Sequence, residues 1–189
     1  MMTQGVVLIS RDRPRLQAGV RASAEVVFGS LLIALCARIA VPLYWTPVPL
    51  TLSTFGVLLM AAFLGPQKGT AAVALYLMEG GCGLPVFAGG GGGWAALLGP
   101  TGGYLAGFLP AAAVVGLLCG GKNRGFVASF LAMAAGTALI WIAGLAWLAH
   151  WFSPRALLAA GLYPFIAFDL VKGALAAACL HFSGRNNRG

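Results

Sequence analysis

Charged residues are scarce in this sequence, in which Asp, Glu, Lys and Arg together occupy only 8% of 189 positions. Soluble globular domains have about 25% charged residues, which cover their water-facing surface. The scarcity therefore argues against a soluble domain. Hydrophobic residues make up 60% of the chain, and the mean hydropathy is +0.90, so the chain is also too apolar to stay disordered. The composition indicates an integral membrane protein.

Acidic residues are the scarcer charged type, because four Asp and Glu stand against twelve Lys and Arg, for a net charge of +8. The basic residues form no patch interleaved with exposed aromatic residues, so we expect no nucleic-acid partner. In an apolar chain, an excess of positive charge instead marks the cytoplasmic loops of a membrane protein.

Motifs for catalysis and metal binding are also missing. The four cysteines lie far apart, without a C-x-x-C pair or nearby histidines, so we expect neither a disulfide framework nor a metal site. No convincing Ser/His/Asp or Cys/His set is present. The segment Gly116–Asn123 resembles a phosphate-binding loop, but Asn123 replaces the Mg²⁺-binding hydroxyl residue, and the segment follows an apolar stretch instead of a strand. We therefore expect no enzyme activity, no ATPase and no cofactor.

Six apolar stretches predict an all-α bundle of six transmembrane helices. They cover residues 26–41, 51–64, 69–78 (extendable to about 84), 104–119, 126–151 and 162–182. Several are shorter than the ~20 residues that span a bilayer, which is tolerated where the backbone lines an enclosed cavity. Three prolines exclude a helix over 42–49. A count of five helices is the alternative if 51–64 and 69–84 form one re-entrant pair, although Gly65-Pro66-Gln67-Lys68 favours a turn.

The distribution of basic residues predicts the orientation. With six spans and a cytoplasmic amino terminus, the inner segments contain Arg11, Arg13, Arg15, Arg21, Lys68, Lys122, Arg124, Arg185 and Arg188. The outer segments contain only Arg155, which satisfies the positive-inside rule. We expect a cell-membrane protein with both termini in the cytoplasm. Its parts would be a basic leader (1–21), one membrane-embedded substrate-binding domain (22–183) and a basic tail (184–189).

Four ionisable residues interrupt the apolar stretches: Arg38, Glu79, Asp169 and Lys172. Each costs at least ~2.5–3.5 kcal/mol to insert, so such residues are usually paired and functional. By helical rise all four belong to the outer half. Asp169 and Lys172 share a helix face, either as a pair that neutralises itself or as contacts to a ligand. Arg38 either reaches the interface or contributes to the site, and Glu79 either caps a helix or lines the cavity mouth.

The segment with the most unusual composition runs from Phe87 to Tyr104 and contains five consecutive glycines, Gly89–Gly93, but no charged residue. A flexible connector is one reading of this composition. Bulky residues occur at intervals along this segment, however, and Trp94 is one of them. Because a connector does not need aromatic side chains, we predict an extracytoplasmic lid over a small ligand.

Several loop motifs together resemble the BioY family, the biotin-specific S components of energy-coupling factor (ECF) vitamin transporters. They are Pro47-Val48-Pro49-Leu50-Thr51-Leu52, Gly83-Leu84-Pro85-Val86-Phe87-Ala88-Gly89-Gly90, Gly99-Pro100-Thr101-Gly102-Gly103-Tyr104 and Asp169-x-x-Lys172. The resemblance covers about residues 25–182. It departs from the family pattern at Ser53, where Gln is expected, and at Ala167-Phe168, where Pro-Gly is more usual.

This resemblance implies a six-helix bundle that captures biotin from outside and couples to a transmembrane T component and two cytoplasmic ATPases. Asp169 and Lys172 match the family's polar ligand contacts, and Thr101, Gly102, Gly103 and Tyr104 match its loop motif. Together with the lid aromatics Phe87 and Trp94, they form the predicted substrate site, to which Arg38 and Glu79 are possible additions. The alternatives are an S component for another vitamin, or a channel or structural module without biotin specificity.

Overall fold

The computed structural model describes the backbone of residues 3–120 and 125–186, and the side chains of residues 17–120 and 125–183. Seven of the basic residues that were used to predict the orientation therefore have side chains outside the described part. They are Arg11, Arg13, Arg15, Lys122, Arg124, Arg185 and Arg188.

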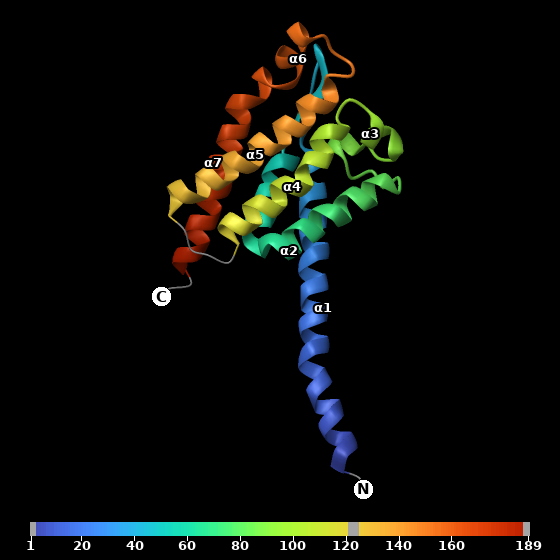
Figure 1. The fold of residues 1–189 in the computed structure, drawn as a ribbon, viewed down its shortest axis with the longest axis vertical. Coiled ribbons are helices and arrows are strands. Elements are labelled where there is room, and N and C mark those ends of the chain that lie inside the picture. Colours follow the sequence, from blue (N-terminus) through green and yellow to red (C-terminus); the bar gives the residue numbers. More distant parts are fainter. Residues whose placement is uncertain (1–2, 121–124, 187–189) are drawn as a thin grey trace.

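The chain is mostly helical, with one small hairpin of two strands (Figure 1). Its elements in order are α1 (Thr3–Arg38), β1 (Ala40–Leu43), β2 (Thr46–Thr51), α2 (Ser53–Gly81), the 3₁₀ turn η1 (Ala88–Gly90), α3 (Trp94–Leu98), α4 (Gly102–Cys119), α5 (Phe126–Leu148), α6 (Pro154–Gly161) and α7 (Tyr163–Asn186). Five segments of the described residues are long and apolar enough to cross a membrane: Gln17–Arg38, Ser53–Gly81, Gly102–Cys119, Phe126–Leu148 and Pro154–Ser183. The protein is therefore a multi-pass membrane protein.

The difference between five segments and the six predicted spans lies in α2. The sequence predicts a turn at 65–68, but helical structure continues through these residues, with a kink where Gly65 has a φ of 78° and a ψ of −180°. Pro66 begins the second arm of the helix, in a position where its missing N–H leaves no intrahelical bond unmade. The two arms correspond to the second and third predicted helices, so the bundle is close to the six-helix expectation.

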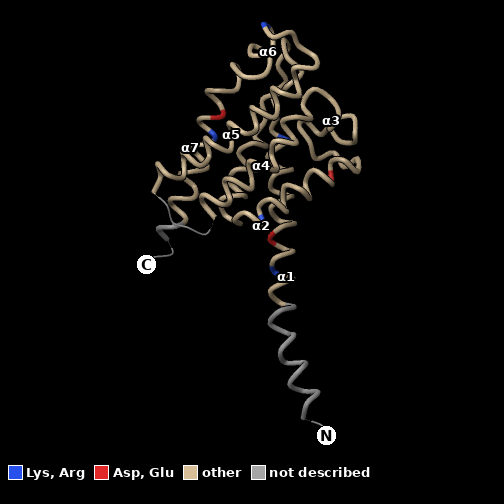
Figure 2. The backbone as a smooth tube through the Cα atoms, viewed as in Figure 1, with Lys and Arg blue, Asp and Glu red and all other residues tan. Residues whose placement is uncertain are grey.

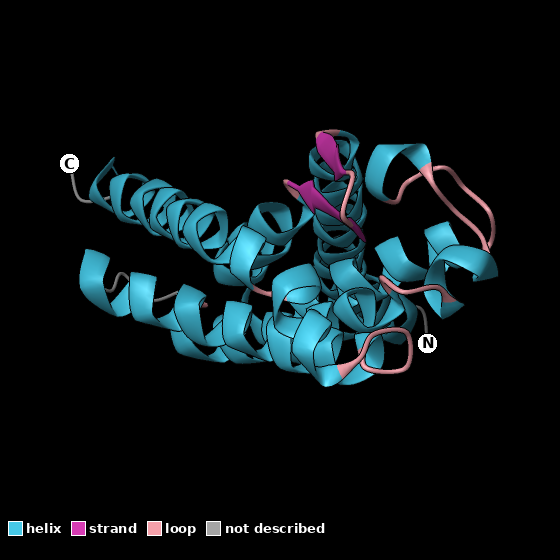
Figure 3. Ribbon diagram, turned by 90° about the horizontal axis from the view of Figure 1, so that it is seen from above, coloured by secondary structure: helices cyan, strands magenta, loops and turns pink. Residues whose placement is uncertain are grey.

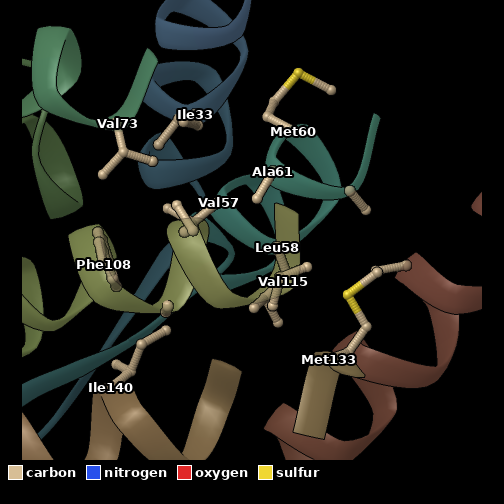
Figure 4. Close-up of a cluster of buried hydrophobic side chains, with 14 of the residues drawn as sticks. Ile33, Val57, Leu58, Met60, Ala61, Val73, Phe108, Val115, Met133 and Ile140 are labelled. Atoms are coloured by element: carbon tan, nitrogen blue, oxygen red, sulfur yellow. The ribbon is translucent and has the colours of Figure 1, made fainter. Parts of the chain in front are cut away.

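Small and branched side chains hold the bundle together. Helix α4 packs between α2 and α5, while α1 packs on α2, and α7 packs on α5 and α2. The core includes Ile33 from α1, Val57 from α2, Val115 from α4 and Met133 from α5 (Figure 4). Charged residues are rare along the bundle (Figure 2), as the composition requires for helices in contact with lipid.

One end of the bundle carries the non-helical structure. We call it the hairpin end, because β1 and β2 lie there together with α3 and α6, while the N-terminal end of α1 and the C-terminal end of α7 lie at the other end (Figures 1 and 3). The strands pair antiparallel, with an irregularity between Val41 and Leu43. Pro42 occupies this irregularity, where a residue without an N–H is tolerated in a strand. Prolines thus excluded a helix here, as predicted, but did not exclude strands.

Candidate functional site

A cavity of about 250 Å³ lies among the elements of the hairpin end. Its lining residues come from β2 and its junction with α2, from α2, α4, α5 and α7, and from the glycine-rich segment 87–101. They are Pro47, Val48, Pro49, Thr51, Ser53, Thr54, Tyr76, Phe87, Ala88, Gly91, Ala96, Thr101, Tyr104, Leu105, Phe108, Ile140, Trp141, Phe165, Asp169 and Lys172. A mainly apolar and aromatic wall with a few polar groups is typical of a site for a small organic ligand.

The charged part of the wall is an ion pair on α7. The ammonium of Lys172 donates to Oδ1 of Asp169 over 2.8 Å, and the indole N–H of Trp141, on α5, donates to Oδ2 over 2.9 Å. Only 6% of Asp169 and 8% of Lys172 are exposed, so the pair faces the interior of the bundle and not lipid. Each carboxylate oxygen already has one donor and keeps a further lone pair that can accept an N–H from a ligand.

Helix geometry explains why these three side chains meet. Residues three apart on a helix project from the same face, which places Asp169 and Lys172 together on α7. Helices α5 and α7 pack against each other, so Trp141 can reach the carboxylate from the neighbouring helix. A buried charge needs this kind of compensation, because an unpaired carboxylate away from water is strongly unfavourable.

The hairpin covers one side of the cavity at the hairpin end, and we call this cover, together with the glycine-rich segment, the roof of the cavity. Its strand β2 contributes Pro47, Val48 and Pro49 to the cavity wall. The hydroxyl of Thr46 donates to the carbonyl of Ala160 at the end of α6 over 2.7 Å, which attaches the hairpin to that short helix. Sequence reasoning identified this segment as non-helical, and residues 47–52 as one of the loop motifs of the family resemblance, but it did not include the segment in the predicted substrate site.

The glycine-rich segment forms the other part of the roof, and it is folded. It contains η1 and α3, and the N–H of Phe87 donates to the carbonyl of Gly91 over 2.9 Å. The N–H of Gly93 also reaches back to the carbonyl of Gly80 on α2 over 2.6 Å. Gly93 has a φ of 81°, in the left-handed region that glycine adopts at little cost. The segment is therefore a structured cover in this conformation, and its motion as a lid remains a prediction.

Five of the eight residues of the predicted substrate site lie together on the wall of the cavity. Asp169, Lys172, Tyr104 and Thr101 line the cavity, and so does Phe87, which is almost fully buried. The hydroxyl of Tyr104 donates to the carbonyl of Gly161 over 2.7 Å, which connects α4 to the end of α6.

Trp94, Gly102 and Gly103 are not among the lining residues. The side chain of Trp94 is 69% exposed on α3, on the outside of the glycine-rich segment. A Cβ at Gly102 would overlap with the carbonyl oxygen of Leu97, and one at Gly103 would overlap with Trp147 on α5. Both glycines thus permit close packing around the start of α4, which holds the neighbouring Tyr104 in place.

Arg38 and Glu79 are also not among the lining residues. Arg38 is exposed at the end of α1, with its guanidinium beside Gly90. The carboxylate of Glu79 accepts a hydrogen bond from the hydroxyl of Ser30 on α1. Of the four ionisable residues that interrupt the apolar stretches, only Asp169 and Lys172 therefore meet at the cavity.

The lining residues that were not identified from the sequence include Trp141, Tyr76 and the hairpin residues. A tryptophan in an apolar stretch looks like a lipid-facing or interfacial residue, and only the packing of α5 on α7 shows its polar contact. The sequence gives a weak indication of a role for Tyr76, because a tyrosine within an apolar helix usually needs a hydrogen-bond partner. Among the described residues, no three His, Cys, Asp or Glu side chains gather in a way that could hold a metal ion.

Comparison with known proteins gives consistent matches over most of the chain. The model of the BioY family matches residues 9–187. A protein named biotin transporter BioY from Thermotoga maritima is 44% identical over 147 residues, which are 77% of this chain and 85% of that protein. A probable biotin transporter BioY from Pyrococcus horikoshii is 40% identical over 155 residues, 80% of this chain and 91% of that protein.

The fold also matches a solved structure. The crystal structure of the S-component for biotin from an ECF-type ABC transporter superposes with a TM-score of 0.81 and 25% sequence identity. The match covers 89% of this chain and 93% of that protein, so the helical bundle described above is the S-component fold.

Proposed function

This chain belongs to the BioY family, and from that premise we propose that it is the substrate-binding membrane subunit of an ECF-type importer, with biotin as its substrate. The observation that carries the proposal is the buried Asp169–Lys172 pair on the wall of an otherwise mainly apolar cavity. A pair that served only helix insertion would have no need of a cavity beside it. The names of the relatives and of the matching structure support biotin as the ligand.

The chemistry of the cavity complements the chemistry of biotin. Biotin has a ureido ring with two N–H donors and a carbonyl, an apolar thiophane ring and chain, and a terminal carboxylate. Asp169 can accept N–H donors, and Lys172 can donate to the carbonyl or to the carboxylate. Aromatic side chains such as Phe108 and Phe165 supply apolar surface for the remainder. The pair is neutral as a whole without ligand, so it is stable in the bundle before biotin enters.

The same proposal includes the orientation of the protein and its partners. The hairpin end would face the extracytoplasmic side of the cell membrane, with the leader (1–21) and the tail (184–189) in the cytoplasm. A T component and two cytoplasmic ATPase subunits would supply the energy for transport, and this subunit would hydrolyse no ATP itself. The basic residues of the inner segments support this orientation through the positive-inside rule.

Equilibrium dialysis of the purified protein against labelled biotin tests the function directly. We expect saturable binding, which excess unlabelled biotin abolishes and excess thiamine or riboflavin does not. Asp169→Asn and Lys172→Ala should each weaken binding by about 1–3 kcal/mol, the cost of leaving a buried hydrogen-bonding group without its partner. Arg155→Gln serves as the control, because Arg155 is exposed on α6 and does not line the cavity.

Each negative outcome has a distinct meaning. Absence of saturable biotin binding by the wild type would refute the proposal, and displacement by another vitamin would assign the cavity to that vitamin. Solute flux through reconstituted protein that does not depend on biotin would instead favour a channel. Unchanged affinity in both charge variants would remove the site assignment alone.

A further inference from the structure

The hydroxyl of Tyr76 is a polar group that the bundle itself leaves unsatisfied. Tyr76 lines the cavity and is fully buried in α2, and its hydroxyl oxygen has no hydrogen-bond partner among the residues that the structure describes. Among the residues that line the cavity, it is the only one with a buried side-chain oxygen or nitrogen in this condition. A buried hydroxyl without a partner costs roughly 1–3 kcal/mol, so its presence calls for an explanation in the function of the site.

The ring of Tyr76 is held firmly where it lies. The ring of Phe87 meets it edge to face, with the centroids 5.4 Å apart and an interplanar angle of 78°. Phe87 in turn rests on Gly80, one helical turn beyond Tyr76, where any Cβ would overlap with the phenyl ring. Because both rings are packed in this way, Tyr76 cannot readily swing its hydroxyl to another protein group.

The hydroxyl of Tyr104 provides a direct contrast on the same cavity. It is also a tyrosine hydroxyl in a largely apolar wall, but it donates to the carbonyl of Gly161 over 2.7 Å. The fold thus satisfies one lining tyrosine with a backbone acceptor and leaves the other without one. The difference indicates that the partner of Tyr76 is supplied from outside the chain.

We propose that the hydroxyl of Tyr76 donates a hydrogen bond to an oxygen atom of the bound ligand, and that it contributes to affinity as a third polar contact beside Asp169 and Lys172. This inference rests on the proposed function of the cavity as the biotin site. A phenol is neutral at physiological pH and can donate one hydrogen bond. It therefore suits a carbonyl or carboxylate oxygen that enters an aromatic part of the wall.

Two variants that each remove a single hydroxyl test this assignment. Tyr76→Phe keeps the ring and its contact with Phe87, and Tyr104→Phe removes the hydroxyl that bonds to Gly161. The dissociation constant for labelled biotin and the thermal unfolding midpoint without biotin are measured for both variants and for the wild type. We expect Tyr76→Phe to weaken biotin binding about three- to tenfold, the effect of losing one hydrogen bond.

The stability measurement separates a ligand contact from a structural role. Without biotin, Tyr76→Phe should have an unchanged or higher unfolding midpoint, because it deletes an unsatisfied group, while Tyr104→Phe should have a lower one. Wild-type affinity in Tyr76→Phe would overturn the assignment, and so would a lowered midpoint or a loss of folding, since either would reveal a structural partner. If the wild type itself fails to bind biotin, the proposed function fails and the role of Tyr76 fails with it.

Discussion

Replacing Lys172 with Met removes the ammonium that lies 2.8 Å from Asp169 but keeps an apolar side chain of similar length. The carboxylate of Asp169 then keeps only the indole N–H of Trp141 among its described donors. Breaking a buried ion pair by removing one partner costs about 3–5 kcal/mol. Because Trp141 still compensates part of the charge, we expect a loss of about 3 kcal/mol in the free energy of unfolding for Lys172→Met.

The variant that removes the other charge, Asp169→Asn, should lower the free energy of unfolding by more than Lys172→Met does. It leaves the ammonium of Lys172, which is 8% exposed, beside a neutral amide, so we expect the upper end of the range, about 4–5 kcal/mol. The double variant Asp169→Asn/Lys172→Met contains no buried charge, and such replacements are often neutral. It should therefore be more stable than either single variant while binding no biotin.

Chemical denaturation of the purified variants in detergent micelles measures these free energies. Arg21→Met is the matched control, because it breaks an ion pair with Glu25 in which 83% of the Arg21 side chain is exposed, and such pairs contribute about 0–1 kcal/mol. The reasoning would be refuted if both single variants were as stable as the control. Losses that simply add in the double variant would also refute it, since they would show that the two charges do not compensate each other.

Three further predictions concern packing, positioning and the roof of the cavity. Gly103→Ala should destabilise the protein by about 1–3 kcal/mol because its Cβ overlaps with α5. Gly19→Ala is the control, because Gly19 lies inside α1 with open space around its Cβ, and alanine there should leave the free energy of unfolding unchanged or higher; equal losses in the two variants would contradict this. Trp141→Phe removes a donor to Asp169 and should weaken biotin binding several-fold in equilibrium dialysis, so full affinity would show that the indole N–H does not position the carboxylate. Thr46→Val removes the hydrogen bond that attaches the hairpin to α6 and should accelerate amide hydrogen exchange in the hairpin; unchanged exchange would mean that other contacts hold the roof.

The helices were largely predictable because few residues interrupt the apolar stretches. The predicted span 104–119 corresponds to α4 (Gly102–Cys119), and 126–151 corresponds to α5 (Phe126–Leu148). Gly65-Pro66 was ambiguous, because a glycine with positive φ followed by a proline is compatible with a turn and with a kink between two helical arms. The hairpin was not predictable from periodicity, since its pairing depends on contacts between segments and its prolines lower the strand propensity.

The part of the site whose residues lie close together in the sequence could be predicted. The spacing of Asp169 and Lys172 on one helix was enough to place them on a common face. The contribution of Trp141 depends on which side of α5 faces α7, which no local pattern reveals. Phe87 and Trp94 look equivalent as aromatic residues of a glycine-rich segment, but one is buried and the other is 69% exposed, because the backbone angles of the intervening glycines decide the direction of each side chain.

Helix α1 is joined to the roof of the cavity almost without a loop. Only Ile39 separates Arg38 from β1, and the carbonyl of Ile39 accepts the N–H of Leu52 over 3.0 Å. With 36 residues, α1 is about 54 Å long at 1.5 Å per residue, and its N-terminal part extends well beyond the other helices (Figure 1). Because the connection is this short, a tilt of α1 would carry the hairpin with it and would thereby change the shape of the cavity wall that β2 lines.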